Sequence, residues 1–430
     1  MPRSRLLPLL AIAVLILALA HWIYWYAAAE RPGRPDTGSL ASRVFLDGDL
    51  PYRLWLPHPH QNVARLEGSI GSLDGLIDDL GRLRGTPDLP RLPAFGGLRL
   101  PPSTELAIAT DDAGMALVAA AEVYPLVGLL SRWAGRLAGN PLLAGGTAEV
   151  GGREVEVRWR SGTWLLTAGG GTMPGGEPEG ARRLPQPGVG EACLAGLRLD
   201  RRSGRLPAGD YRLVRRRGDL ELTSGDPARV EALGALAARR GPLPLVRLEG
   251  TESQPESTET ARPGTAGFGA ARHWRAFALI PGLESLGGLP GAVAVHRGSE
   301  GFSLPGERVA ETIGVGVRTR QSSHWQVRAL DRSSLERGDD LGRFVDALEP
   351  QLPLELALWI ELRSADRLTE QVVEALEAVP IVGRREAGRW RVAESLLARL
   401  AGFDRLTVLV SPSPVAVHAR LWSVSRLGEN

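Results

Sequence analysis

The first thirty residues carry the longest apolar run of the chain. Residues 6–29 contain no Asp, Glu, Lys or Arg, and aromatic side chains gather near the end of the run, at positions 22, 24, 25 and 26. A helix of this length would measure about 36 Å at about 1.5 Å per residue, which exceeds the ~30 Å hydrocarbon core of a bilayer. The pattern predicts a transmembrane helix at 6–29, preceded by a cytoplasmic tail at 1–5 that carries Arg3 and Arg5.

A cleaved secretory signal is the alternative for the same run. Ala27 and Ala29 precede Glu30 in the small-residue pattern that signal peptidases cut. The length of the run and the aromatic residues just before this site favour an uncleaved anchor. Because no later segment is comparably apolar, we expect a single-pass protein of the inner membrane, with the bulk of the chain on the periplasmic side.

The pattern from residue 30 to 168 predicts a tether followed by an α+β domain. Residues 30–43 are rich in Pro, Gly and Ser, which is typical of a linker. Over 44–168, alternation predicts strands and spacing of three and four predicts helices. The first expected elements are strands at 52–56 and 63–67 and a helix at 72–83. Strands at 105–110 and 115–123 follow, and then a helix that begins at Pro125 and has apolar residues at 126, 129, 130, 133 and 137. Three strands separated by 151–152 and 161–162 complete the domain.

A Gly/Pro-rich linker is predicted at 169–190, followed by a small ββα unit at 191–248. Strands at 211–215 and 220–223 flank a turn, and Asp226 and Pro227 have the residue types of a helix N-cap and first position. Residues 249–271 are poor in hydrophobic residues, so they are predicted to be a disordered linker.

The last predicted domain spans 272–424. Its expected elements are strands at 311–319 and 324–330, a helix to 348, a strand at 354–362, a helix to 379, a short helix at 393–401, and strands at 405–410 and 415–422. A strand that leads into a helix therefore recurs along the chain. This order favours an α+β fold class, in which recurring strand–helix units pack on mainly antiparallel sheets after the N-terminal transmembrane helix.

Composition excludes several chemistries. All 51 basic residues are Arg, so the lysine-dependent sites are ruled out, namely Walker A loops, Ser-x-x-Lys acylating sites and Schiff bases. The single Cys193 cannot form an intrachain disulfide and is expected to be a packed thiol.

No local motif predicts a catalytic residue, a cofactor site or a metal site. His58 and His60 are the closest histidine pair, and no carboxylate or cysteine beside them completes a metal site. The acid pairs 78–79, 111–112 and 339–340 are expected on solvated faces or at caps, because neighbours in sequence point apart.

An excess of arginine over acid marks residues 191–248. A guanidinium group suits phosphates and carboxylates, so the candidate anion-contacting residues are Arg212, Arg215, Arg216, Arg217, Arg239 and Arg240. The expected partner is another envelope protein or an anionic envelope component, and not nucleic acid. An internal rival is the downstream acidic set at 249, 252, 256 and 259, which could cover the same arginines. A solvated surface is the remaining interpretation.

The sequence as a whole indicates a membrane-anchored bacterial envelope protein with a non-catalytic role in binding or scaffolding. The alternative is an envelope hydrolase whose site is assembled from residues far apart in the sequence.

Overall fold

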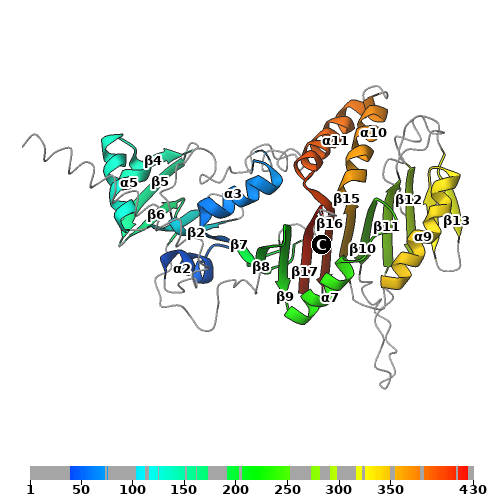
Figure 1. The fold of residues 1–430 in the computed structure, drawn as a ribbon, viewed down its shortest axis with the longest axis horizontal. Helices are drawn as coiled ribbons and strands as arrows, with labels where there is room; N and C mark the ends of the chain where they lie inside the picture. The colour runs from blue at the N-terminus through cyan, green and yellow to red at the C-terminus, as the bar shows by residue number, and fades with distance from the viewer. Residues whose placement is uncertain are drawn as a thin grey trace, which may run out of the picture. The chain divides into compact units, whose positions relative to one another are not determined.

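A computed structural model describes residues 39–72, 75, 103–111, 116–123, 125–150, 153–160, 162–172, 191–202, 206–251, 273–280, 291–297, 316–321, 325–348, 354–377, 382–412 and 415–424 (Figure 1). The chain divides into two compact units, which comprise residues 1–62 with 99–196 and residues 63–98 with 197–430. Both are mixtures of helices and antiparallel strands. No helix within the described ranges is long and apolar enough to cross a membrane, and the predicted span at 6–29 lies outside those ranges.

The sheet of unit 1 has the order β7-β1-β2-β3-β6-β5-β4. The neighbouring strands from β1 to β4 in this order pair antiparallel throughout. The strands are β1 (Tyr52–Pro57), β2 (Ser103–Thr110), β3 (Leu117–Val123), β4 (Gly146–Val150), β5 (Arg153–Arg160), β6 (Thr163–Ala168) and β7 (Ala192–Leu199), the last of which crosses into unit 2. The predicted strand at 52–56 and the predicted three-strand meander are confirmed.

Helices cover both faces of this sheet. α2 (Leu40–Asp47) begins at the N-cap Ser39 and buries Val44 and Phe45 against a cluster that includes Leu165 of β6. The next residue back along β6, Trp164, points to the opposite face, because side chains alternate along a strand. There its indole N–H donates a hydrogen bond to the Leu142 carbonyl of α6 (Pro141–Ala144) at 2.7 Å.

The predicted strand at 63–67 is wrong, because these residues lie in α3 (Pro59–Ile70). Pro59, Asn62, Leu66 and Ile70 are the buried positions, and their spacing of three and four is helical. The alternation of the predicted strand covers only five residues, so the longer helical pattern prevails. α3 contains the point at which the chain passes between the two units.

The sheet of unit 2 is antiparallel, with the order β8-β9-β17-β16-β15-β10-β11-β12-β14-β13. The strands are β8 (Gly209–Arg216), β9 (Asp219–Gly225), β10 (Leu245–Thr251), β11 (His273–Ile280), β12 (Gly291–Arg297), β13 (Arg318–Gln321), β14 (Gln326–Ala329), β15 (Leu356–Glu361), β16 (Phe403–Pro412) and β17 (Val415–Ser423). The predicted hairpin at 211–215 and 220–223 is confirmed, and its strands β8 and β9 join the same sheet as the C-terminal strands.

This order has a twofold pattern. The chain runs β8-β9-α7-β10-β11-β12 and then β13-β14-α9-β15-β16-β17, so two copies of one strand–helix series follow each other. β8 corresponds to β13, β9 to β14, β10 to β15, β11 to β16 and β12 to β17. When each strand is exchanged for its counterpart, the strand order of the sheet reads in the opposite direction. In each copy the helix joins two strands that are parallel and separated by three others, as expected because parallel strands need a crossover connection.

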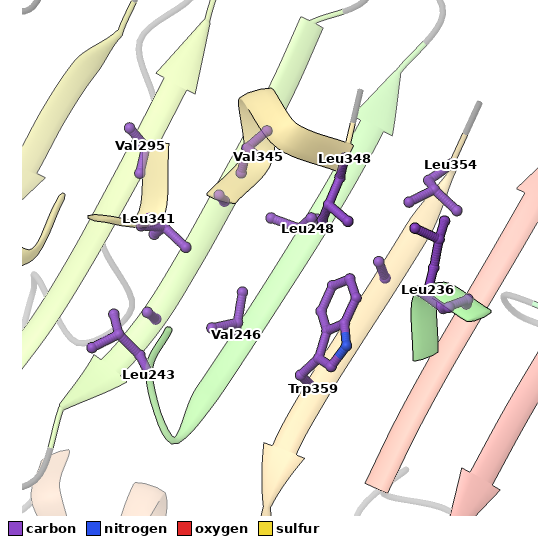
Figure 2. Packing of buried hydrophobic residues seen from close by; sticks show 14 of the residues in the cluster. Leu236, Leu243, Val246, Leu248, Val295, Leu341, Val345, Leu348, Leu354 and Trp359 are labelled. Carbon is purple, nitrogen blue, oxygen red and sulfur yellow. The ribbon is translucent and has the colours of Figure 1, made fainter. Parts of the chain in front are cut away.

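α7 (Pro227–Ala237) and α9 (Arg332–Leu348) pack on the same face of the sheet. Their leucines join one buried cluster with side chains from most of the strands beneath them, as Figure 2 shows around Leu236, Leu341, Val246 and Trp359. α7 has the predicted N-cap, since the Asp226 carboxylate accepts hydrogen bonds from two backbone N–H groups of the first turn. The local signals of this helix therefore predicted it correctly.

A helical pair interrupts the second copy between β15 and β16. α10 (Leu362–Glu377) follows β15 directly, and α11 (Val382–Arg399) packs against it through Ala387 and Trp390, which contact Val372. The predicted helix that follows the strand at 354–362 is confirmed, whereas the predicted short helix at 393–401 is part of the longer α11. The predicted helix at 72–83 and the residues 252–271 of the predicted linker lie outside the described ranges.

Candidate functional site

The strand pair β9–β17 brings together charged residues that are about 200 positions apart in the sequence. The antiparallel register sets Thr223 opposite His418 and Glu221 opposite Arg420. Because side chains alternate, these four residues share one face with Asp219, and this is the face that α7 covers. We call Asp219, Glu221, Arg405, His418, Arg420 and Trp422 the β9–β17 cluster.

Asp219 is the most heavily bonded member of the cluster. Its Oδ2 accepts hydrogen bonds from Arg420 Nη2 at 2.6 Å and from Arg420 Nε at 3.1 Å. Its Oδ1 accepts from the Ser423 backbone N–H at 2.6 Å and from the Ser423 hydroxyl at 2.7 Å. The carboxylate is largely buried. Arg420 balances its charge, and the hydrogen bonds to Arg420 and Ser423 satisfy its lone pairs.

His418 and Glu221 form a second pair beneath α7. His418 Nε2 lies 3.0 Å from Glu221 Oε1, and His418 is only 1% exposed. The hydrogen bond with His418 lowers the pKa of Glu221, and the positive charges of Arg420 and Arg216 act in the same direction. An ionised carboxylate only accepts hydrogen bonds, so the imidazole proton of this contact sits on Nε2.

Trp422 connects the cluster to the end of α7. The Arg420 guanidinium lies 3.8 Å from the Trp422 ring centroid and the Arg405 guanidinium 4.5 Å from it, both within cation–π range. Arg405 also donates to the Arg239 carbonyl at 3.0 Å, which satisfies a backbone group at the C-terminal end of α7. Burial lowers the pKa of Arg405, and the nearby charge of Arg240 lowers it further.

The structure brings some of the predicted anion-contacting residues to this cluster. Arg216 and Arg240 lie near its two ends, beside Glu221 and Arg405 respectively. Arg212 shares the face of Arg216, whereas Arg215 is on the opposite face of β8, opposite Leu220 in the register.

Arg217 lies in the turn that joins β8 to β9, and Arg239 follows the end of α7. In this turn Arg217 has a φ of 51°, so it is not on a strand face with Arg215. A two-residue hairpin turn needs positive φ, and here Arg217 and Gly218 supply it. Arg239 contributes its carbonyl to the cluster through the bond from Arg405.

Sequence reasoning missed Asp219, Glu221, Arg405, His418 and Arg420. No short motif joins residues this far apart, and their contacts arise only through the pairing of β9 with β17. A partial signal exists in β17, where His418, Arg420 and Trp422 alternate with Val417, Ala419 and Leu421. Polar side chains at every second position of a strand mark one face as polar, but they do not say what that face contacts.

The other predicted sites have ordinary surroundings. His58 has a φ of 45° immediately before α3, and His60 is at the start of that helix. Asp339 and Asp340 lie on α9 in partly exposed ion pairs with Arg320, Arg337 and Arg343. Glu249, one of the acids proposed to cover the arginines, pairs with Arg247 of its own strand, and 252, 256 and 259 lie outside the described residues.

The chemistry available to the cluster is electrostatic. His418, whose residue type is the commonest general acid or base in enzymes, is buried beneath α7, so its position gives no support to a catalytic role. Within the described ranges, no group of three or more His, Cys, Asp or Glu residues could hold a metal ion. Cys193 is half-buried against the core of unit 1, as expected for a packed thiol.

Comparisons with models of protein families, with curated proteins and with solved structures find no match for this chain.

Proposed function

We propose that this protein is a bacterial envelope protein, anchored in the inner membrane by residues 6–29, that binds an anionic envelope component on the periplasmic side without catalysing a reaction. The observation that carries the binding role is the β9–β17 cluster with Arg216 and Arg240 at its ends. Guanidinium groups gather there, and the acids beside them are held in internal pairs. The anchor is supported by the length and uncharged character of the run at 6–29.

Fractionation tests the anchor. We expect the full chain to stay in the membrane after carbonate extraction, and to become accessible to protease only once the outer envelope has been opened. A mature chain that begins at Glu30 would contradict the anchored arrangement.

Binding of a soluble headgroup tests the anionic partner. The full chain in a neutral detergent is titrated with dihexanoyl phosphatidylglycerol, which stays monomeric at low concentration, at low and at high salt. Each arginine near a headgroup contributes roughly 1 kcal/mol, so Arg216→Gln together with Arg240→Gln should weaken binding roughly 30-fold at low salt. The effect should fade as salt screens the charges.

The matched control is Arg332→Gln with Arg343→Gln, which removes two exposed arginines from α9 of the same unit. Equal affinity of the two double variants, or no binding by the unmodified chain, contradicts an anion-contacting role and leaves the arginines as a solvated surface.

A further inference from the structure

Helix α5 (Pro125–Leu137) of unit 1 packs with its apolar side outward. Four of its large side chains are among the most exposed hydrophobic residues described: Leu129 is 64% exposed, Leu130 47%, Trp133 63% and Leu137 69%. We call these four residues the α5 stripe. A surface helix of a soluble protein normally turns such a stripe toward the core, so the stripe marks an interaction surface.

The inner side of α5 is built from small residues. Gly128 and Gly135 are buried, two turns apart on one side of the helix. A Cβ at Gly135 would lie 2.6 Å from Leu143 Cβ of α6, and one at Gly128 would lie 3.1 Å from the Trp159 ring. Between them, the Arg132 guanidinium lies 5.9 Å from the centroid of the same ring. The glycines allow a close approach to Trp159 and α6, and the orientation of the stripe follows from this packing.

The charge of α5 suits an anionic surface. Arg132 and Arg136 are its charged residues, and it contains no acid. A basic helix with Trp and Leu on its exposed side is the type that lies in a membrane interface, with its apolar side among the lipid chains. Thirteen residues give a helix of about 20 Å, which is too short to span a bilayer, so α5 would lie parallel to the membrane plane.

The predicted anchor is connected to this unit by a short segment. Ser39, the N-cap of α2, follows the end of the run at 6–29 by ten residues, and α2 belongs to the same unit as α5. Ten residues reach at most about 35 Å when fully extended. The unit that carries the α5 stripe is therefore held close to the bilayer.

The geometry points to α5 as a second membrane contact: an interfacial helix that inserts Leu129, Leu130, Trp133 and Leu137 into the outer leaflet of the anchoring membrane, with Arg136 at the level of the anionic headgroups. This inference rests on the proposed anchoring by residues 6–29.

Lipid quenching in proteoliposomes tests the inference on the full chain. In a Cys193→Ala background, a single fluorophore is attached at Leu137→Cys, at Glu154→Cys or at Leu17→Cys. The vesicles contain phosphatidylethanolamine and phosphatidylglycerol with bromine on the acyl chains. Glu154 is the matched control, because it is exposed in the same unit on β5, on the side of the sheet opposite Trp159. Leu17 lies in the middle of the predicted span and reports on anchoring alone.

We expect the acyl-chain bromines to quench the fluorophore at 137 several-fold more than the one at 154, and as strongly as the one at 17. Leu130→Glu, which adds a charge to the stripe, should reduce quenching at 137 toward the level at 154 and leave quenching at 17 unchanged. Strong quenching at 17 with equal, weak quenching at 137 and 154 would overturn the inference and leave the anchor intact.

Weak quenching at 17 would overturn the anchor and the inference with it. A fluorophore at 137 that is shielded from aqueous iodide but is not quenched by lipid bromine would show that protein covers the stripe, as in pairing with a second copy, and this result also overturns the inference.

Discussion

Asp219 shows how one side chain can hold two neighbouring strands of a large sheet together. It accepts hydrogen bonds from Arg420 and from both the backbone and the hydroxyl of Ser423, so it ties β9 to the end of β17. Removal of the carboxylate would leave Arg420 without its counter-charge and the Ser423 N–H without its acceptor in a largely buried place. A half-satisfied buried network costs more than its absence.

We therefore predict that Asp219→Ala lowers the free energy of unfolding by roughly 2–4 kcal/mol. Urea denaturation followed by circular dichroism measures the change. Glu336→Ala, which removes an exposed partner of Arg332 on α9, is the control and should cost less than about 1 kcal/mol. A loss at Asp219 no larger than the loss at Glu336 would show that the Asp219 network does not hold the strand pair.

Glu221 makes the stability of unit 2 depend on pH. Its hydrogen bond with His418 lowers its pKa in the folded state, so the unfolded chain binds the proton more tightly. The stabilising contribution is complete above the unfolded glutamate pKa of about 4.3 and is lost as the pH falls through the lower folded value.

The expected result is that Glu221→Gln destabilises the protein more at pH 7 than at pH 3, because the unmodified side chain loses its charge in acid. Urea midpoints at the two pH values, compared with those of the unmodified chain, give the difference. Glu336→Gln is again the matched exposed control. A destabilisation that is the same at both pH values would contradict a role for the Glu221 charge.

At the scale of elements, local sequence signals predicted the helices and hairpins whose ends carry specific residues. Asp226 and Pro227 begin α7, and Arg217 with Gly218 turns β8 into β9. The pairing of β9 with β17 could not be predicted, because the sequence of a short strand does not identify the distant strand with which it pairs. The pattern of α5 predicted an apolar side but not its exposure. The signal for its orientation was the pair Gly128 and Gly135, spaced seven residues apart.

Glycine positions also control the packing of α9 on the sheet. A Cβ at Gly338 would overlap Val327 Cγ1 of β14, so this glycine sets how closely the helix approaches the strand. Gly388 of α11 has nothing within 4 Å of a Cβ placed there. The same substitution should therefore have opposite effects at these two helical positions.

We predict that Gly338→Ala destabilises unit 2 by roughly 1–3 kcal/mol through overpacking, although alanine is the better helix former. Gly388→Ala should instead stabilise the protein by up to about 1 kcal/mol. Thermal or urea unfolding of the two variants measures both effects. If both variants gained stability, α9 would not be in close contact with β14.

At the scale of the whole molecule, the order of strands in unit 2 implies cooperative unfolding. β15, β16 and β17 of the second copy stand between β9 and β10 of the first, so neither copy has a continuous sheet of its own. Loss of packing at one end should therefore reach the strands at the other end.

Hydrogen exchange followed by mass spectrometry tests this cooperativity. Gly338→Ala alters the contact of α9 with β14, near one end of the sheet, yet we expect it to speed exchange in β9 and β17 by about the same factor as in β12. The equality holds for amides that exchange only through global unfolding. A faster exchange confined to β12, β14 and α9 would show that the two ends open separately.

The twofold pattern of unit 2 matches the arrangement expected of two swapped subunits. A homodimer of a ββαβββ chain, in which each subunit passes its last three strands to the other, would have the strand order of this sheet. Gene fusion of the two subunits would place them on one backbone, and the α10–α11 pair would then be an insertion in one subunit only. Unit 2 has the strand order of a domain-swapped dimer on a single chain, so its two halves, expressed as separate polypeptides, should associate and restore the same sheet.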